Sequence, residues 1–557
     1  MGPSMIVALS RAAAFTGAII LLVFGMLYTE THSDVAWLLL LLFCGILMMY
    51  AILPRMSDSV PHVNSTIVSI GAICMVGFLL MTVQLVRIQI VQADEISQRS
   101  ASVADGSVVQ DPRNRTRDRD VARGRILTRD EDVVADTVER EGGVFERTYP
   151  NPHLSYLAGY HSPALFGNTQ LESVYDETLM GREGGNPFNE WLDQVLHRTR
   201  HGYDIQLTVD SELQRLGYDL LGDRDGSIVV MDAETGAIYA MVSKPHIDPN
   251  RLYAGYGPNM DQQVSEASEY WVQVTESEGS PLLFRPTQGL YAPGSVFKTV
   301  TAASVLEHGL ADPSTVFRNE GALVVGSHVI EEQNLPDDGR VSFTLSESYG
   351  YSLNVVFADL GIRLGRERLS ETARQFGFES TIPFDFQVSQ SRISSNPEYL
   401  DADIGLAETG FGQGQLFATP LQIAMTTQAV VNNGMMSEPF LMHRIRDNEG
   451  VVLSETRPSS WQEAVDSSIA SELQQIMIES VESGWATDAQ ISGAVVGGKT
   501  GTAEVGDRTP HAWYTGFAGQ DEPRFVISVI VEHGGGGGAV ALPIAREMLV
   551  MAMDRID

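Results

Sequence analysis

A serine and a lysine three residues apart stand where a loop enters an apolar helical segment. The motif reads Pro293-Gly294-Ser295-Val296-Phe297-Lys298-Thr299, and its spacing places Ser295 and Lys298 on one face of a helix predicted at about 294–308. A serine hydroxyl becomes a nucleophile when a base takes its proton, and a lysine whose pKa is lowered by burial can be that base. The N-terminus of the helix adds backbone donors that favour negative charge. An S-x-x-K tetrapeptide is common, so the interpretation depends on further signals.

Two further polar motifs follow in the same order along the chain. Ser352-Leu353-Asn354 is, by itself, typical of a turn between two helices. Lys499-Thr500-Gly501-Thr502 is more informative, because the preceding Val495–Gly498 favours a strand whose glycines let a ligand approach the backbone. The alternative for Lys499 is an exposed lysine at the edge of a sheet.

The scarcity of lysine supports a joint reading of these motifs. The chain has 37 Lys+Arg residues, of which only Lys244, Lys298 and Lys499 are lysines. Two of the three fall inside S-x-x-K and K-T-G. Because the composition strongly favours arginine over lysine, the remaining lysines are expected where arginine cannot replace them, as at an amine that accepts a proton.

Composition excludes several classes of protein. The 557 residues suggest three to four structural units, and 43% apolar with 19% charged residues exclude wholesale disorder. A formal charge of −34 argues against a nucleic-acid partner, which requires a basic surface. The two cysteines, Cys44 and Cys74, provide neither a disulfide scaffold nor a zinc-ribbon site.

Residues 1–90 are predicted to lie in a membrane. They hold three charge-free stretches of about the length that spans a bilayer, with helices expected at about 12–29, 35–54 and 65–86. A buried helix pair of a soluble protein and a cleaved signal peptide both fit this succession less well. Arg11 precedes the first expected helix and Arg55 follows the second, so both lie on the same side of the membrane. The positive-inside rule therefore places the N-terminus in the cytoplasm and the chain after about residue 90 outside.

The outer part divides at about residue 226. Residues 91–226 are expected to form a mainly β domain and a linker helix at Ser211–Leu221 with Asp210 as its N-cap. Residues 227–557 have strands at both ends and helices between them, which predicts one sheet built from distant parts of the sequence. The expected strands are Ser227–Met231, Ala237–Val242, Trp513–Gly519 and Phe525–Glu532, and the expected helices cover about 294–308, 345–376, 419–432 and 543–553.

The three motifs, in this order, resemble those of penicillin-binding proteins and serine β-lactamases. The resemblance covers about residues 87–555 and points to the class B penicillin-binding proteins, although these usually have one transmembrane helix rather than three. Further similar segments are Arg123–Ile126, Tyr149–Pro152, Gly159-Tyr160, Gly167–Glu172, Gly412–Gly414, Thr419–Gln422 and Trp513–Ala518. The implied fold is an α/β (α+β) penicillin-binding transpeptidase or β-lactamase-like domain on a mainly β pedestal, with N-terminal transmembrane helices.

The resemblance implies a peptidoglycan D,D-transpeptidase that cross-links stem peptides through a serine acyl-enzyme. Ser295 would attack the D-Ala–D-Ala carbonyl and Lys298 would accept its proton. Ser352 and Lys499 would pass a proton to the leaving amine, while Asn354 holds the lysine and the substrate amide. The residues expected to bind the substrate and its oxyanion are Ser295, Thr500, Gly501 and Thr502, with the oxyanion hole formed by the backbone N–H groups of Ser295 and Thr502. No metal or cofactor is expected.

The expected partners are stem peptides ending in D-Ala-D-Ala, β-lactam antibiotics as inhibitors, and a membrane-embedded glycan polymerase. A polymerase partner is expected because about 140 residues between membrane and transpeptidase leave no room for a glycosyltransferase domain. The alternatives are a D,D-carboxypeptidase or β-lactamase, which pass the acyl group to water, a β-lactam sensor, and a non-catalytic scaffold. A sensor would be expected to carry a metalloprotease H-E-x-x-H motif, which the sequence lacks.

Overall fold

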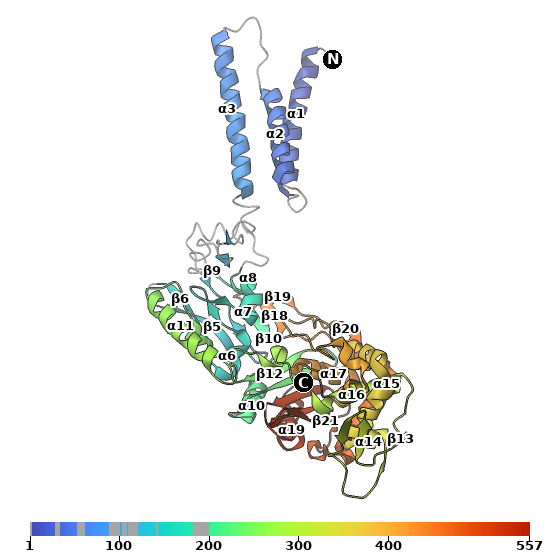
Figure 1. Ribbon diagram of the computed structural model, residues 1–557. Helices are drawn as coiled ribbons and strands as arrows, with labels where there is room; N and C mark the ends of the chain where they lie inside the picture. The colour runs from blue at the N-terminus through green and yellow to red at the C-terminus, as the bar shows by residue number, and fades with distance from the viewer. Residues whose placement is uncertain are drawn as a thin grey trace. The chain divides into compact units, whose positions relative to one another are not determined.

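The computed structural model describes residues 3–27, 34–52, 62–88, 101–102, 108–109, 121–140, 143–181 and 200–556. It divides into two compact units, one comprising Met1–Arg117 with Asn186–Trp191 and the other Asp118–Gly185 with Leu192–Asp557. Figure 1 shows both units, coloured along the chain.

The first unit contains three helices, α1 (Pro3–Leu27), α2 (Asp34–Ile52) and α3 (His62–Val86). Two of the described helices have stretches long and apolar enough to cross a membrane, Met5–Gly25 in α1 and Ser69–Val86 in α3, whereas α2 has the shorter apolar stretch Leu39–Ile52. The indole of Trp37 on α2 donates a 2.6 Å hydrogen bond to Gln84 on α3. Arg55, on which the expected orientation depends, lies outside the described residues.

The second unit contains a six-stranded sheet in the order β19-β18-β10-β4-β5-β6. Four strands come from the expected pedestal: β4 (Ile126–Leu127), β5 (Val133–Arg140), β6 (Val144–Thr148) and β10 (Asp204–Leu207). The other two, β18 (Met442–Arg446) and β19 (Val452–Glu455), come from far along the chain, and β18 pairs antiparallel with β10. The pedestal sheet is therefore completed by the region that the sequence assigns to the transpeptidase domain.

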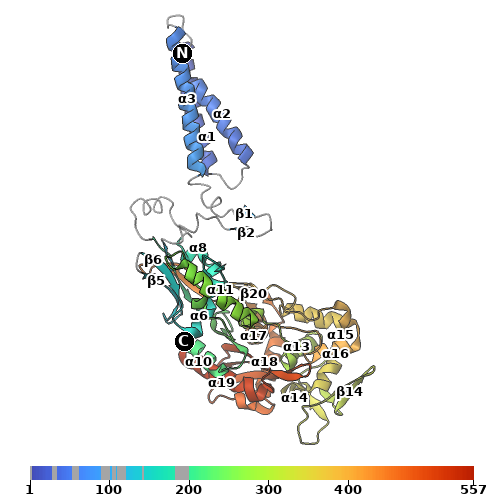
Figure 2. The same cartoon turned by 60° about the vertical axis from the view of Figure 1, so that its left-hand side comes forward.

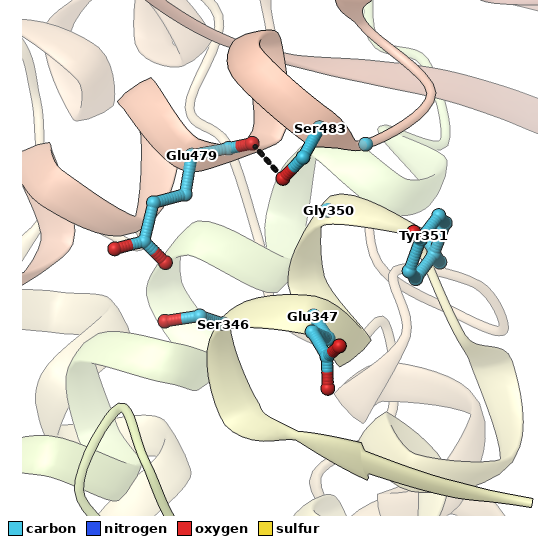
Figure 3. Close-up of a pocket in the computed structure, with 7 residues that line it drawn as sticks. Ser346, Glu347, Gly350, Tyr351, Glu479 and Ser483 are labelled. Atoms are coloured by element: carbon cyan, nitrogen blue, oxygen red, sulfur yellow. Dashed lines mark hydrogen bonds between the residues drawn. The ribbon is translucent and has the colours of Figure 1, made fainter.

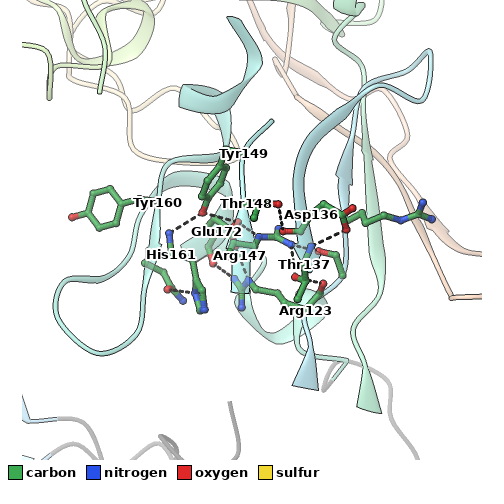
Figure 4. A network of polar contacts seen from close by, with 12 residues as sticks. Arg123, Asp136, Thr137, Arg147, Thr148, Tyr149, Tyr160, His161 and Glu172 are labelled. Carbon is green, nitrogen blue, oxygen red and sulfur yellow. Dashed lines mark hydrogen bonds and ion pairs between the residues drawn. The ribbon is translucent and has the colours of Figure 1, made fainter. Parts of the chain in front are cut away.

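A buried ion cluster fixes the first strands of this pedestal sheet (Figure 4). Glu172 is completely buried between two arginines, with 2.6 Å contacts to the Nε atoms of both Arg123 and Arg147. The hydroxyl of Tyr149 donates a third bond to this carboxylate and accepts the backbone N–H of His161. Burial alone would raise the pKa of Glu172, but Arg147 and Arg123 lower it to about 2, so the carboxylate remains charged.

A five-stranded antiparallel sheet forms the centre of the catalytic region, in the order β12-β11-β23-β22-β21. Its strands are β11 (Gly226–Asp232), β12 (Ile238–Lys244), β21 (Val495–Val505), β22 (Arg508–Gly519) and β23 (Phe525–Val531). The first and last parts of the catalytic region thus meet in one sheet, as the sequence predicts, and the α/β fold class is confirmed.

Helices cover both faces of this sheet, because successive side chains of a strand point to opposite faces. Ile228 and Val230 of β11 pack in one core cluster with α10 (Ser211–Leu221) and α19 (Gly537–Arg555), which lie side by side in Figures 1 and 2. Val229 and Met231 point into the other cluster. That second cluster holds side chains from α13 (Lys298–Glu307), α17 (Pro420–Val431) and α18 (Ser467–Ser483).

Some helices begin where the sequence places a capping residue. Asp210 accepts the backbone N–H of Leu213 at the start of α10, as expected of its N-cap. The helical region expected at 345–376 is divided in the structure into α14 (Leu345–Gly350) and α15 (Asn354–Gln375), with a turn at Ser352 that agrees with the interpretation of Ser352-Leu353-Asn354 as a turn between two helices. The terminal helix begins at Gly537, six residues before its expected start.

The other described elements complete the catalytic region and its junction with the pedestal. The strands are β3 (Val121–Ala122), β7 (His161–Ser162), β8 (Gly167–Asn168), β9 (Arg200–His201), β13 (Val316–Arg318), β14 (Ala322–Val325), β15 (His328–Glu331), β16 (Ser342–Thr344), β17 (Met435–Ser437) and β20 (Ser460–Glu463). The helices include α6 (Pro152–Ala158), α7 (Gln170–Val174), α8 (Asp176–Leu179), α11 (Met260–Glu276), α12 (Arg285–Gln288) and α16 (Asp403–Gly410).

Candidate active site

Ser295 lies on a short 3₁₀ turn, η4 (Gly294–Phe297), that leads into α13. The turn packs closely against β21 and a neighbouring loop, because a Cβ on Gly294 would lie 2.8 Å from the carbonyl oxygen of Thr502. The backbone N–H of Gly294 also donates a 2.9 Å bond to the carbonyl of Gly412. Gly294 has φ +58°, a conformation that glycine adopts without a steric penalty. Glycine at this position therefore brings Ser295, which is 9% exposed, next to the K-T-G-T strand.

Lys298 is completely buried one turn after Ser295. Its Nζ donates to the carbonyl oxygen of Ser352 at 2.7 Å, to the Ser352 hydroxyl at 3.3 Å and to Oδ1 of Asn354 at 2.8 Å. The ring of Phe357 lies 5.4 Å away. All three acceptors come from the junction of α14 and α15, and among the described residues no hydrogen bond joins Nζ to Ser295. Catalytic hydrogen bonds are often long or absent without substrate, so Lys298 remains the candidate base for Ser295.

The α14–α15 junction is built around an unusual backbone conformation at Ser352. Its φ is +60°, in the left-handed region that side chains other than glycine seldom adopt. The turn directs the Ser352 carbonyl and the Asn354 side chain toward the same ammonium group. A strained non-glycine residue that orients two acceptors on one amine is typical of a functional site.

Lys499 is completely buried on β21, where side chains alternate between the core and solvent. Its Nζ donates a 2.9 Å bond to the carbonyl of Thr500 and lies 5.6 Å from the ring centre of Tyr349. The alternative of an exposed lysine is therefore wrong. Thr500 and Thr502 point to the more accessible side, and β21 is the last strand of its sheet.

The two buried lysines have low pKa values for partly different reasons. Burial lowers the pKa of Lys298 to about 7, against the carboxylate of Glu332, which raises it. Burial lowers the pKa of Lys499 well below its usual value, and the charge of Lys298 lowers it further. In the structure the causes acting on Lys298 are burial and the opposing Glu332.

The structure thus brings together the expected side chains of Lys298, Ser352 and Asn354, and places Ser295 beside the strand that carries Lys499 and Thr502. It also contributes residues that no motif indicates. Glu332 and Asn334 follow β15 and contact the α14–α15 junction, and the hydroxyls of Tyr349 and Thr299 share a 2.8 Å bond beneath the lysines. These residues lie in polar or helical stretches whose composition is ordinary, so only the fold reveals them.

A small cavity lies between α14 and α18, separate from this constellation (Figure 3). Its lining residues are Ser346, Glu347, Gly350, Tyr351, Glu479, Ser483 and Gly484. None of them belongs to the three motifs. Among the described residues no cluster of three or more His, Cys, Asp or Glu side chains could hold a metal ion.

Two family descriptions match the chain. "Penicillin binding protein transpeptidase domain" matches residues 226–550, and "Penicillin binding protein A dimerisation domain" matches residues 123–205. The first match contains all three motifs, and the second contains the buried cluster of Glu172.

Similar proteins cover nearly the whole chain. The peptidoglycan D,D-transpeptidase PbpA of Mycolicibacterium smegmatis is 28% identical over 510 residues, which are 88% of this chain and 99% of that protein. The structure of penicillin-binding protein A from M. tuberculosis as a penicillin G acyl-enzyme complex aligns with TM-score 0.70 at 29% identity, covering 78% of this chain and 99% of the other. The D,D-transpeptidase domain of a peptidoglycan glycosyltransferase from Eggerthella lenta aligns with TM-score 0.67 at 30% identity, covering 78% and 100%.

Proposed function

Because the chain belongs to the class B penicillin-binding proteins and is therefore a peptidoglycan D,D-transpeptidase, we propose that Ser295 is the residue that carries the acyl group. The observation that supports this assignment most strongly is the environment of Lys298. A completely buried amine with a pKa of about 7 lies one turn from the serine hydroxyl. An amine in this state can accept a proton near neutral pH, as a general base must.

The reaction then divides between the named side chains. Lys298 takes the proton of Ser295, whose oxygen attacks the carbonyl of the penultimate D-alanine of a stem peptide. Collapse of the tetrahedral intermediate breaks the amide bond, and the proton taken up by Lys298 is relayed by Ser352 and Lys499 to the amine of the departing D-alanine, so that Lys298 is neutral again. An amine of a second stem peptide then attacks the ester, which forms the cross-link and returns the serine oxygen its proton. Asn354 holds Lys298 in place and accepts or donates a bond to the substrate amide.

Backbone groups bind the developing charge and the peptide. The N–H groups of Ser295 and Thr502 form the oxyanion hole, in which one donor is worth about 3–4 kcal/mol in comparable enzymes. Close packing of Gly294 against Thr502 supports this pairing. The substrate peptide adds alongside Thr500-Gly501-Thr502 at the open side of β21, where main-chain hydrogen bonds provide affinity.

The three parts of the chain have separate roles in this proposal. Residues 1–90 anchor the enzyme in the bacterial membrane by several helices, residues 91–226 form the pedestal, and residues 227–557 form the transpeptidase domain outside the cytoplasm. The long apolar stretches in α1 and α3 support membrane anchoring. Glycan strands come from a membrane-embedded polymerase, and the pedestal and helices provide the surface for that partner. β-Lactams inhibit the enzyme by acylating Ser295.

Transfer to an amine rather than to water distinguishes this function from a D,D-carboxypeptidase. The test supplies the full-length enzyme in detergent with a stem peptide ending in D-Ala-D-Ala and a second peptide as acceptor amine, and measures both products by mass spectrometry. We expect cross-linked product to exceed hydrolysed tripeptide-D-Ala, and Ser295→Ala to form neither. Hydrolysed product alone would assign the chain to the carboxypeptidases, and no turnover by the wild-type enzyme would favour a scaffold.

A further inference from the structure

Glu332 occupies the space between β15 and the start of α15, and its carboxylate is saturated with hydrogen bonds. One oxygen accepts the side-chain amide of the buried Asn319 at 2.9 Å and the backbone N–H of Val355 at 3.0 Å. The other accepts the backbone N–H groups of Gln333 and Asn334 at 3.1 and 3.2 Å. Four donors on one carboxylate fix its position.

The bond to Val355 supplies a cap that α15 lacks in its own sequence. The N-cap position of α15 is Leu353, whose side chain cannot accept a hydrogen bond. Glu332 replaces it from another segment, and its negative charge lies at the positive end of the helix. The residue between Leu353 and Val355 is Asn354, so the cap also fixes the backbone that carries a ligand of Lys298.

Asn334 braces the same junction from the other side. Its side-chain amide donates a 3.0 Å bond to the Ser352 carbonyl, the same oxygen that accepts Lys298 at 2.7 Å. Its own carbonyl accepts the indole N–H of Trp485 at 3.2 Å. The bond from Asn334 therefore stabilises Ser352 in its left-handed conformation, in which its carbonyl oxygen also accepts the bond from Lys298.

We propose that Glu332 and Asn334 form a positioning clamp for this transpeptidase, which holds Ser352 and Asn354 against Lys298 and, through the charge of Glu332, sets the pH range in which Ser295 is acylated. The inference rests on the proposed roles of Ser295 and Lys298. Both members of the clamp act through the α14–α15 junction, by bonds to the Ser352 carbonyl and the Val355 N–H, so both are positioning residues rather than catalytic ones.

The sign of the charge effect follows from the groups that face Lys298. Glu332 raises the pKa of Lys298 while burial lowers it to about 7. Two other titratable groups lie near Lys298. The pKa of Lys499 is well below its usual value, and burial raises the pKa of the Tyr349 phenol. Loss of the Glu332 charge makes Lys298 release its proton at a lower pH. The acidic limb of the acylation profile then moves to lower pH.

The test measures the rate of acylation of the full-length enzyme by a fluorescent penicillin between pH 5 and pH 9. Glu332→Gln keeps an acceptor for Val355 but removes the charge, so we expect the acidic limb to move down by about half a pH unit or more. Glu332→Asp keeps the charge and is expected to leave the limb in place while the rate falls. The matched control is Glu331→Gln, the same change at an exposed neighbour, for which both rate and limb stay as in the wild type.

Asn334→Ala tests the clamp without any change of charge. Loss of one bond to the Ser352 carbonyl is expected to reduce the acylation rate by about threefold to tenfold with the limb unmoved. Thermal unfolding shows whether Glu332→Gln folds. If it does not, Asn334→Ala still tests the inference. An acidic limb that stays at the wild-type pH in a folded Glu332→Gln enzyme, or a wild-type rate in Asn334→Ala, would overturn the clamp.

The failure of this inference differs from the failure of the proposed function. The adduct on the wild-type enzyme is first mapped by mass spectrometry. An adduct on Ser295 together with an unmoved limb rejects only the clamp, whereas an adduct elsewhere rejects the assignment of the nucleophile itself.

Discussion

Lys298 and Lys499 are both completely buried, and the charge of Lys298 is one of the two causes that lower the pKa of Lys499. A protonated Lys298 therefore favours the neutral form of Lys499 in this buried site. Burial lowers the pKa of Lys298 itself to about 7, so part of this amine is neutral near pH 7 and can take the serine proton.

Lys298→Arg tests the need for a neutral amine. Arginine keeps the positive charge but stays protonated at every pH at which proteins are stable, so it cannot accept the proton of Ser295. We expect the acylation rate to fall by about 10²–10⁴-fold, the range that general-base catalysis contributes, while non-covalent binding of substrate persists.

Lys244→Arg is the matched control for this change. Lys244 donates to the carbonyl of Gly222 and stacks on the ring of Tyr218, both of which a guanidinium group can also do. We expect a wild-type acylation rate. A loss of less than about tenfold in Lys298→Arg would mean that Lys298 only positions Ser295.

The pH dependence of acylation reports the protonation of Lys298. Because burial lowers the pKa of its amine to about 7, acylation should rise with pH and reach half of its maximum near pH 7. The measurement is the second-order rate of β-lactam acylation between pH 5 and pH 9. A half-maximum near pH 10 would indicate an amine with its ordinary pKa and would contradict the buried-base mechanism.

The pedestal cluster predicts a strong effect on stability. Glu172→Gln leaves Arg123 and Arg147 buried without their shared carboxylate, which costs about 3–5 kcal/mol of unfolding free energy. Glu146→Gln, at the solvent-accessible Arg140–Glu146 pair, is the control and should cost about 0–1 kcal/mol. Thermal unfolding of the full-length protein in detergent measures both, and equal losses would contradict the account of the cluster.

The Glu172 carboxylate also makes the stability of the folded protein decrease at low pH. The pKa of Glu172 is about 2 in the folded protein, below its value of about 4.3 in an unfolded chain. Its contribution is therefore fully present above about pH 4.3 and is lost as the pH falls toward 2. Glu172→Gln should lose that part of the acid sensitivity.

Membrane topology is tested with single cysteines. Cys44 and Cys74 are first replaced by alanine, and a cysteine is then introduced at Asp261, an exposed residue of α11, or at Ser57 in the expected second loop. A membrane-impermeant thiol reagent should label position 261 from outside the cell and position 57 only after the membrane is opened. The reverse pattern would reject an external catalytic domain.

Local signals in the sequence predicted much of the fold. Asp210 marks the start of α10 because an N-cap acts within three residues, and the continuous apolar run of Ser227–Met231 indicates a buried strand. The Ser352-Leu353-Asn354 motif indicates a turn, but no local signal predicts the positive φ of Ser352, since a serine adopts it only when surrounding contacts hold it there. The addition of β18 to the pedestal sheet depends on a partner more than 230 residues away in β10, which composition and periodicity do not reveal.

Motifs in the sequence predicted one part of the candidate site, and the packing of the fold determines the rest. The spacing of Ser295 and Lys298 and the K-T-G-T strand predicted which side chains carry the chemistry. Glu332, whose carboxylate raises the pKa of Lys298, follows a hairpin, β14–β15, that no motif marks.

The central claim is that Ser295 is the nucleophile, and mapping of a penicillin adduct tests it most directly. The full-length enzyme is labelled with a fluorescent penicillin, digested, and the modified peptide is sequenced by mass spectrometry, with Ser295→Ala as the matched variant. The account predicts one adduct, on Ser295, and no labelling of Ser295→Ala at an unchanged unfolding temperature. An adduct on another serine, or undiminished labelling of folded Ser295→Ala, would contradict it.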